Sequence, residues 1–511
     1  MKKIMENNGI TLVALVVTII ILLIFSGVGI ASLSGDSGIL SRAAEAKKST
    51  IIAKVIEDVD RDVVEKVLSK KGKGVISENE FVEILSKYGS IDQTEKQVLN
   101  FRNLITIEGK YKILINDIIK RIGTYIDIID RSGANVPIIP EGANVEYVTW
   151  ENSGLGEPIC SKTRPKNWYN YSLGKWANIK TVSNGLEAYW VWVPRFKYTE
   201  PMSDKATKIQ VEFVNGKEKA IDVHPAFSFG EDELEGFWVA KFEASSNTNN
   251  PDMNYGGGND DTLSVQSKPG VQSWRLIDTD KIFRVCRNMQ STKGVLSGSV
   301  NVDSHMMKNT EWGAIAILSQ SIFGVFNPNS SNDGQIWNNP NGYGDGKYAY
   351  TGYTGDSVDA SNNYGSTNKY DKINKYNTYN GTKGSTTGTI YGIYDMAGGA
   401  WEYVAGCLKN QRSTNFERYY GPIADKYLNV YTNGSNGNYN ESIDEIKGDA
   451  VEETRYWNKD FDVFPTAELP VFARGGNYGD YEGTGIFYFY KIHGGGHPFG
   501  TFRPVLATGI N

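Results

Sequence analysis

The chain begins with the pattern of a membrane span. Residues 10–33 include no charged side chain, and Lys2 and Lys3 precede them. A helix rises about 1.5 Å per residue, so this run is long enough to cross a hydrocarbon core about 30 Å thick. Lysines before the span favour a cytoplasmic amino terminus. The pattern predicts a transmembrane helix over 10–33, with the membrane as a partner and the rest of the chain extracytoplasmic.

The next pattern has the period of an α-helix. Apolar residues recur three or four positions apart within 41–70, which predicts a long helix beyond the span. Ser77 and Glu80 have the spacing of a capping box, and we expect a short helix over 81–88. Residues 111–115 alternate in part, as a strand does. These elements predict a helix and a small α+β region over 34–130.

A linker with several Gly and Pro residues, 131–143, precedes a more aromatic region. Residues 189–195 and 236–243 carry aromatic and β-branched side chains on both faces, which is typical of buried strands. Residues 304–318 have helical spacing, and Ser304 is the expected N-cap.

The regular pattern stops over residues 327–389. This stretch is dominated by Gly, Asn, Ser, Thr, Tyr and Asp, which predicts exposed loops. Its Asn and Asp clusters have the oxygen chemistry of calcium ligands but lack the spacing of an EF-hand.

Composition excludes some classes of function. The 511 residues allow two or three domains, and the net charge of -6 comes without a basic stripe, so no nucleic-acid partner is expected. Cys160, Cys286 and Cys407 lie far apart and form no CxxC pair. A zinc site is therefore not expected, whereas one disulfide is allowed and its pairing stays open.

Gly9 stands directly before the apolar run, which starts at Ile10. Cleavage after Gly9 would leave the helix on the mature protein, a layout that resembles the leader of type IV pilins and pseudopilins. The resemblance implies a 1–9 leader, a prepilin peptidase and pilin-like subunits as partners, and a location at the cell surface or in a pilus. The glutamate that this family usually carries at the fifth mature position is Ala14 here. A plain membrane anchor is the alternative.

Three segments near the carboxyl end carry a second resemblance. Residues 390–404 contain YDMAGGAWEY, residues 473–478 read ARGGNY, and residues 500–506 read GTFRPVL. Their order and spacing resemble the signature of the formylglycine-generating enzyme family, the sulfatase-modifying factors, which has the usual forms YDMxGNVWEW, RGGSW and GFR. The resemblance implies a C-type lectin-like domain over 144–511. It also implies structural roles, with the arginines paired to buried carboxylates, for Asp395, Trp401, Glu402, Arg474, Gly475, Gly476 and Arg503.

The chemistry of that family is incomplete in this chain. The cysteine pair with which the enzymes oxidise their substrate is missing from 477–490, so we expect no catalytic residue of that kind. Gly399 replaces the asparagine that often helps to hold calcium, which leaves Glu402 as the candidate calcium ligand. Because His493 and His497 could ligate a metal, a metal-dependent oxidase is an alternative.

Residues 477–501 combine aromatic side chains with many glycines, as binding loops do. A strand over 486–491 would bury about half of the aromatic side chains. The segment also matches the position of the variable region in proteins that retroelements diversify, which implies differences between alleles. The expected ligand-contacting residues are Asn477, Tyr478, Asp480, Tyr481, Tyr488, Tyr490, His493, His497 and Phe499.

The sequence thus predicts an α+β protein: a transmembrane, pilin-like long helix with a small α+β region, followed by a C-type lectin-like domain rich in irregular loops. The expected function is non-catalytic binding of a protein or glycan ligand at the cell surface or on a pilus. One alternative is a structural subunit of a type IV pilus or a type II secretion-like system. The other is the metal-dependent oxidase.

Overall fold

The computed structural model describes residues 39–70, 75–91, 104–115, 118–119, 126–127, 130–150, 155–199, 209–248, 255–325, 335–340, 349–358, 373–408, 425–431, 446–455, 457–478 and 483–510. They form two compact units, which meet in the sequence between residues 113 and 114. The boundary precedes the predicted linker 131–143, because that segment is anchored in the second unit. The buried Asn135 side chain donates hydrogen bonds to the carbonyl oxygens of Val214 and Glu235, at 3.0 and 2.9 Å.

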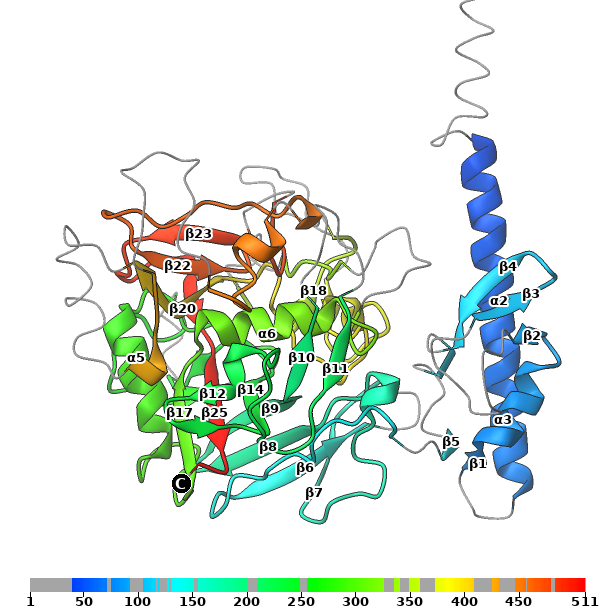
Figure 1. Ribbon diagram of the computed structural model, residues 1–511, viewed down its shortest axis with the longest axis horizontal. Coiled ribbons are helices and arrows are strands. Elements are labelled where there is room, and N and C mark those ends of the chain that lie inside the picture. The colour runs from blue at the N-terminus through cyan, green and yellow to red at the C-terminus, as the bar shows by residue number, and fades with distance from the viewer. Residues whose placement is uncertain are drawn as a thin grey trace, which may run out of the picture. The chain divides into compact units, whose positions relative to one another are not determined.

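The first unit pairs a long helix with a short one and a small sheet (Figure 1). Helix α3 begins with the predicted capping box: the Ser77 N–H donates to Glu80 Oε2 at 2.8 Å, and Ser77 Oγ accepts from the Glu80 N–H. Side chains of α2 and α3 form the buried core. The elements are α2 Ile39–Ser69, β1 Ile76–Ser77, α3 Glu78–Leu85, β2 Gly89–Ile91, β3 Leu104–Ile107 and β4 Tyr111–Leu114, with β5 Ile126–Asp127 following in the chain.

The structure corrects the predicted fold class. The described part of the chain is mostly sheet and loop, with four α-helices, α2, α3, α5 and α6. No helix in this part has both the length and the apolar character to span a membrane, since the long helix α2 carries charged residues along its length. The predictions of a pilin-like transmembrane architecture, and of a membrane-anchored extracytoplasmic or pilus location, are therefore wrong on this finding. The segment 10–33 for which the span was predicted, and the cleavage site Gly9–Ile10, lie outside the described residues.

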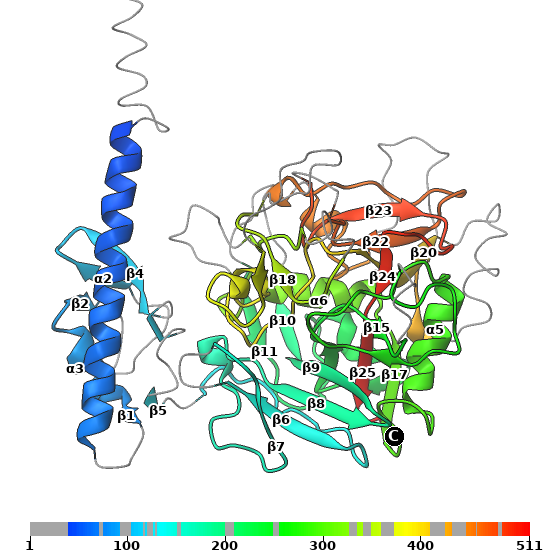
Figure 2. The ribbon, with the colours of Figure 1, turned by 180° about the vertical axis from the view of Figure 1, so that it is seen from behind.

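A seven-stranded antiparallel sheet forms the base of the second unit (Figures 1 and 2). Its strand order is β17-β25-β14-β9-β8-β6-β7, and its central strands β9 and β14 are almost wholly buried, as their apolar sequences predict. The strands are β6 Val145–Thr149, β7 Ile159–Ser161, β8 Asn178–Ser183, β9 Leu186–Pro194, β14 Gly236–Ala240, β17 Val302–Met306 and β25 Pro504–Thr508.

A second, five-stranded sheet has the order β21-β20-β22-β23, with β24 paired to β20. Helix α6 lies between the two sheets in both views (Figures 1 and 2) and is buried along its whole length. The sheet consists of β20 Trp401–Leu408, β21 Asn429–Tyr431, β22 Val471–Arg474, β23 Phe489–Ile492 and β24 Gly500–Phe502. The remaining elements are α5 Thr279–Arg287, α6 Asn309–Ser319, β10 Phe196–Tyr198, β11 Val211–Phe213, β12 Ser228–Phe229, β13 Asp232–Glu233, β15 Ser245–Ser246, β16 Val265–Gln266, β18 Tyr353–Thr354 and β19 Asn374–Lys375.

The helix predicted over 304–318 starts later than expected. Residues 302–306 are strand β17, paired with β25 from Val302↔Thr508 to Met306↔Pro504. Ser304 is not an N-cap: its hydroxyl donates to the carbonyl oxygen of Cys286 at 2.7 Å. Pairing with a distant strand thus overrides the helical spacing of these residues.

Candidate functional site

The three carboxyl-terminal motifs, far apart in sequence, come together in the second sheet. Strand β20 pairs with β22 on one side, with Glu402 opposite Arg474, and with β24 on the other, with Glu402 opposite Thr501. Arg503 follows β24 directly. The sheet therefore brings together one charged residue from each motif, namely Glu402, Arg474 and Arg503.

Arg503 and Glu402 form a buried bidentate ion pair. Arg503 Nε donates to Glu402 Oε2 at 2.9 Å, and a terminal nitrogen donates to Oε1. The guanidinium also donates to the carbonyl oxygens of Ala240 and Tyr394, at 2.8 and 2.9 Å. Because both carboxylate oxygens of Glu402 are bound to Arg503, Glu402 does not fit the expected role of a calcium ligand.

Arg474 does not follow the expectation of a carboxylate partner. It donates to Asn309 Oδ1 at 2.7 Å and to the carbonyl oxygens of Asp449, Ala450 and Tyr488, at 3.1, 2.9 and 3.0 Å. These bonds tie β22 to the start of α6 and to the 477–501 segment. Arg474 is therefore a structural brace.

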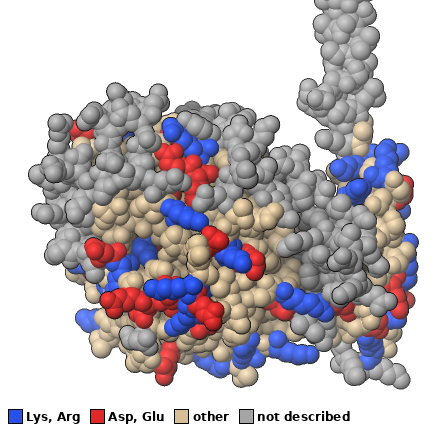
Figure 3. Space-filling model, viewed as in Figure 1, with Lys and Arg blue, Asp and Glu red and all other residues tan. Residues whose placement is uncertain are grey.

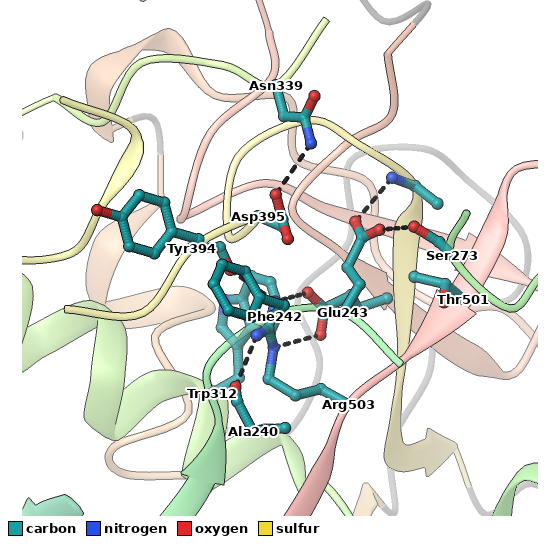
Figure 4. Close-up of polar contacts among 12 residues, drawn as sticks. Ala240, Phe242, Glu243, Ser273, Trp312, Asn339, Tyr394, Asp395, Thr501 and Arg503 are labelled. Atoms are coloured by element: carbon teal, nitrogen blue, oxygen red, sulfur yellow. Dashed lines mark hydrogen bonds and ion pairs between the residues drawn. The ribbon is translucent and has the colours of Figure 1, made fainter. Parts of the chain in front are cut away.

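Asp395 braces a neighbouring loop. It adopts a left-handed conformation with φ 62°. Its carboxylate accepts a hydrogen bond from Asn339 Nδ2 at 2.9 Å (Figure 4) and another from the Gly352 N–H at 2.9 Å. Burial raises the pKa of Asp395 to about 6, although the charge of Arg503 opposes the shift. A non-glycine residue in this conformation is strained, and the two hydrogen bonds hold it in place.

Glu243 occupies the space beside Gly399, where the resembled family carries an asparagine. A Cβ atom on Gly399 would lie 2.4 Å from Glu243 Oε1, which accepts a hydrogen bond from the Ala400 N–H at 2.8 Å. The hydroxyl of Ser273 contacts Glu243 Oε2 and also donates to the carbonyl oxygen of Ala349 at 2.7 Å. A hydroxyl has one proton and a carbonyl only accepts, so the proton between Ser273 and Glu243 belongs to the carboxyl group. Burial likewise raises the pKa of Glu243, and the nearby carboxylates add to the shift.

The predicted ligand-contacting residues divide by exposure. Asn477, Tyr478 and Tyr488 are at most 4% exposed and belong to the core in this structure, which corrects their expected role. Three other side chains, Tyr490, His497 and Phe499, are half-buried, and His493 is exposed. Asp480 and Tyr481 lie outside the described residues.

The exposed part of this segment belongs to a larger cluster of rings. We define the aromatic surface as Trp401, Phe461, Tyr490, His497 and Phe499. The Trp401 ring lies 6.4 Å from Tyr490, 4.6 Å from His497 and 5.9 Å from Phe499, centroid to centroid. The ring of Phe461 stacks on Tyr490 at 5.9 Å. Three separate segments thus contribute rings to one continuous surface.

Sequence reasoning missed two members, Phe461 entirely and Trp401 in that it was expected to have only a structural role. The Phe461 side chain is 47% exposed, although a phenylalanine in the run Phe461–Phe464 has the pattern of a core residue. Its N–H donates to the carbonyl oxygen of Gly483 at 2.8 Å, and its own carbonyl accepts from the Phe489 N–H at 3.1 Å. This pairing places Phe461 beside β23, and no local sequence signal reveals it.

The geometry of the histidines disfavours the alternative of a metal centre. His493 Nδ1 accepts a hydrogen bond from the Gly495 N–H at 3.0 Å, and His497 Nδ1 accepts one from the Phe499 N–H at 3.2 Å. A neutral ring with an accepting Nδ1 carries its proton on Nε2, so neither nitrogen offers a lone pair to a metal. Burial, and then the charge of His493, lower the pKa of His497. Among the described residues, no group of three or more His, Cys, Asp or Glu side chains is arranged to hold a metal.

The three cysteines carry no disulfide. Cys286 and Cys407 are buried, and burial raises the pKa of both thiols; Cys160 is exposed on β7. On the face shown in Figure 3, the described basic and acidic side chains are interspersed. Neither the models of known protein families nor the sequences of curated proteins match this chain.

Proposed function

We propose that this protein is a non-catalytic binding protein and that its aromatic surface contacts a protein ligand. The observation that carries the proposal is the continuous set of partly exposed rings from β20, β23, the 457–465 segment and the 493–499 loop. The resemblance of the three motifs to the formylglycine-generating enzyme family supports a scaffold role for the sheet beneath.

Rigidity favours binding by these rings. Aromatic side chains have few rotatable bonds, and rings that pack on one another lose little further entropy when a partner covers them. Tyr, Trp and Phe are enriched where binding energy concentrates in protein interfaces. Backbone hydrogen bonds already order the segments that carry Phe461 and His497. The rings of the aromatic surface are therefore already ordered before a ligand binds.

The buried polar groups favour scaffolding over catalysis. Glu402, Arg503 and Arg474 are at most 1% exposed, and their charged atoms bind one another, backbone carbonyls or an amide. Groups with these partners hold segments together and do not meet a substrate. The proposal therefore assigns no catalytic residue.

The test uses the full-length protein on arrays of proteins and, separately, of glycans. We expect saturable binding to a protein probe that falls at least about tenfold in Phe461→Ala and Tyr490→Ala, since a central aromatic contact contributes about 2 kcal/mol or more. Tyr379→Ala is the matched control, because Tyr379 is 63% exposed and lies outside the aromatic surface. Binding to glycans alone, or equal loss in all three variants, would refute the proposal.

The proposal also predicts where natural variants differ. If retroelements diversify residues 477–501, alleles should differ mainly at surface-accessible positions such as the half-buried Tyr490 and the exposed His493, and should keep the buried Tyr488. Sequencing the gene from related strains tests this, and substitutions spread evenly over the second unit would count against it.

A further inference from the structure

The 493–499 loop supplies two rings of the aromatic surface and is held by hydrogen bonds from two other segments. The Tyr403 hydroxyl, from β20, donates to the carbonyl oxygen of Gly495 at 2.7 Å. The Gly496 N–H donates to Asp278 Oδ1 at 2.7 Å. The middle of the loop is thus fixed on both sides, and its ends depend on contacts within the loop itself.

Two histidine side chains close turns within this loop. His493 Nδ1 accepts the Gly495 N–H at 3.0 Å, and His497 Nδ1 accepts the Phe499 N–H at 3.2 Å. A histidine nitrogen accepts a hydrogen bond only while it carries no proton. Protonation of His497 would turn this acceptor into a donor that faces another donor, the Phe499 N–H. The turn that places the Phe499 ring therefore requires a neutral His497.

The surroundings of His497 favour the neutral ring. Its half-buried imidazole lies 4.6 Å from the Trp401 ring, which would attract a cation. Burial, and then the charge of His493, outweigh that contact and lower the pKa of His497. In an opened loop His497 would titrate near the ordinary histidine pKa of about 6.5. The ordered loop therefore has its full advantage above that pH and loses it as the pH falls below it.

Other titratable and charged groups face the loop from the elements packed against it. The 275–278 segment supplies both signs of charge, since Asp278 accepts the Gly496 N–H and Arg275 donates to the carbonyl oxygen of Pro498 at 2.6 Å. The neighbouring strands and the 477–478 segment supply Tyr403, Tyr490, Lys491 and Tyr478. Histidine is the side chain that ordinarily changes charge between about pH 5 and pH 8, so His493 and His497 are the groups of this set that respond there.

We propose that His497 is an acid-sensitive switch of the aromatic surface: the neutral ring holds Phe499 in place for a ligand, and protonation opens the turn and releases the ligand. The release step rests on the proposed binding function, whereas the opening of the turn does not. One pKa unit between the ordered and the opened loop corresponds to about a tenfold change in the equilibrium between them.

Two measurements on the full-length protein test the opening of the turn without a ligand. NMR of protein labelled with ¹⁵N-histidine reports the tautomer and protonation of each of the four histidines. Hydrogen exchange reports protection factors for residues 493–500. At about pH 7.5 we expect the His497 proton on Nε2, and at about pH 5 a protonated ring and a several-fold loss of protection in the loop.

His497→Asn is the matched variant, because an asparagine oxygen accepts the N–H two residues on in the same way and does not titrate. Its loop should keep the same protection at both pH values. His493→Asn retains the switch residue, so its loop should still lose protection in acid. A His497 ring that stays neutral at the lower pH, protection that survives its protonation, or an equal loss in His497→Asn would overturn the proposal.

The release step is measured with a protein probe that binds on the array. Its affinity for the unmodified protein should fall several-fold between about pH 7.5 and pH 5. In His497→Asn the affinity, whatever its value at the higher pH, should change little between the two. Equal affinity of the unmodified protein at both pH values would overturn the switch. Absence of any protein probe would instead refute the proposed function, and the exchange data would still decide whether the turn opens.

Discussion

The buried network of Glu402, Arg474 and Arg503 and the aromatic surface lie next to each other in the second sheet, but they use their side chains in opposite ways. In the network, Arg503 and Glu402 direct their charged atoms at each other and at fixed backbone groups. On the surface, Phe461 and Tyr490 pack on each other and leave area exposed. The charged residues of the family-like motifs therefore build the scaffold, whereas rings that lie mostly outside those motifs are available to a partner.

The largest expected effect comes from breaking the buried ion pair. Glu402→Gln removes the bidentate partner of the buried Arg503, which should lower the free energy of unfolding by about 3–5 kcal/mol. Urea unfolding followed by tryptophan fluorescence measures it. The control is Asp280→Asn, which removes the surface partner of Arg284 and should change stability by less than about 1 kcal/mol. Equal effects would show that the network is not the scaffold.

A smaller loss should follow when the asparagine of the resembled family is restored at Gly399. The new side chain meets the Glu243 carboxyl group, and overpacking of this kind destabilises by about 1–3 kcal/mol. Gly258→Asn is the matched control, because Gly258 also has a left-handed φ, of 60°, but open space around it. Thermal unfolding compares the two variants, and a Gly399→Asn protein as stable as Gly258→Asn would contradict the placement of Glu243.

The stability of the second unit should also depend on pH, through the buried side chain of His305. Its ring lies 3.0 Å from Glu311 and 3.3 Å from Asp303. Burial lowers the pKa of His305, but the two carboxylates outweigh it and the net pKa is raised. Protonated His305 therefore adds its full stability below the unfolded pKa of about 6.5, and that stability is lost as the pH rises through the folded pKa.

The measurement is the free energy of unfolding between pH 6 and pH 10. It should fall with rising pH more steeply in the unmodified protein than in His305→Gln. Parallel curves for the two proteins would mean that His305 does not titrate as an ion-pair partner.

The smallest effect on stability is expected at the aromatic surface. The stacked pair Phe461 and Tyr490 should show a coupling of about 0.5–1.5 kcal/mol in a double-mutant cycle of unfolding, because partly exposed rings gain little from burial. A larger coupling would place these rings in the core instead.

Local patterns predicted much of the structure, and long-range contacts account for the failures. The Ser77 capping box and strands β9 and β14 follow from spacing and side-chain type, and the structure confirms them. The helical spacing of its neighbours predicts Ser304 at the start of a helix, and only pairing with β25 makes it a strand residue.

Residues of the aromatic surface could be predicted from the sequence only where a single segment supplies them. The 477–501 segment stands out by its aromatic and glycine content, and it supplies Tyr490 and His497. Which of its rings are buried depends on β22 and on the 457–465 segment, so the burial of Tyr478 and Tyr488 could not be derived from spacing. Phe461 and Trp401 join the surface only through contacts between distant segments.

The most direct test measures binding and stability together in Tyr490→Ala. Affinity for a protein ligand found on the array and the free energy of unfolding are determined on the same full-length sample. The account predicts an affinity at least about tenfold weaker with stability lowered by no more than about 1–2 kcal/mol. Unchanged affinity would contradict it, as would a loss of affinity that appears only when the protein unfolds.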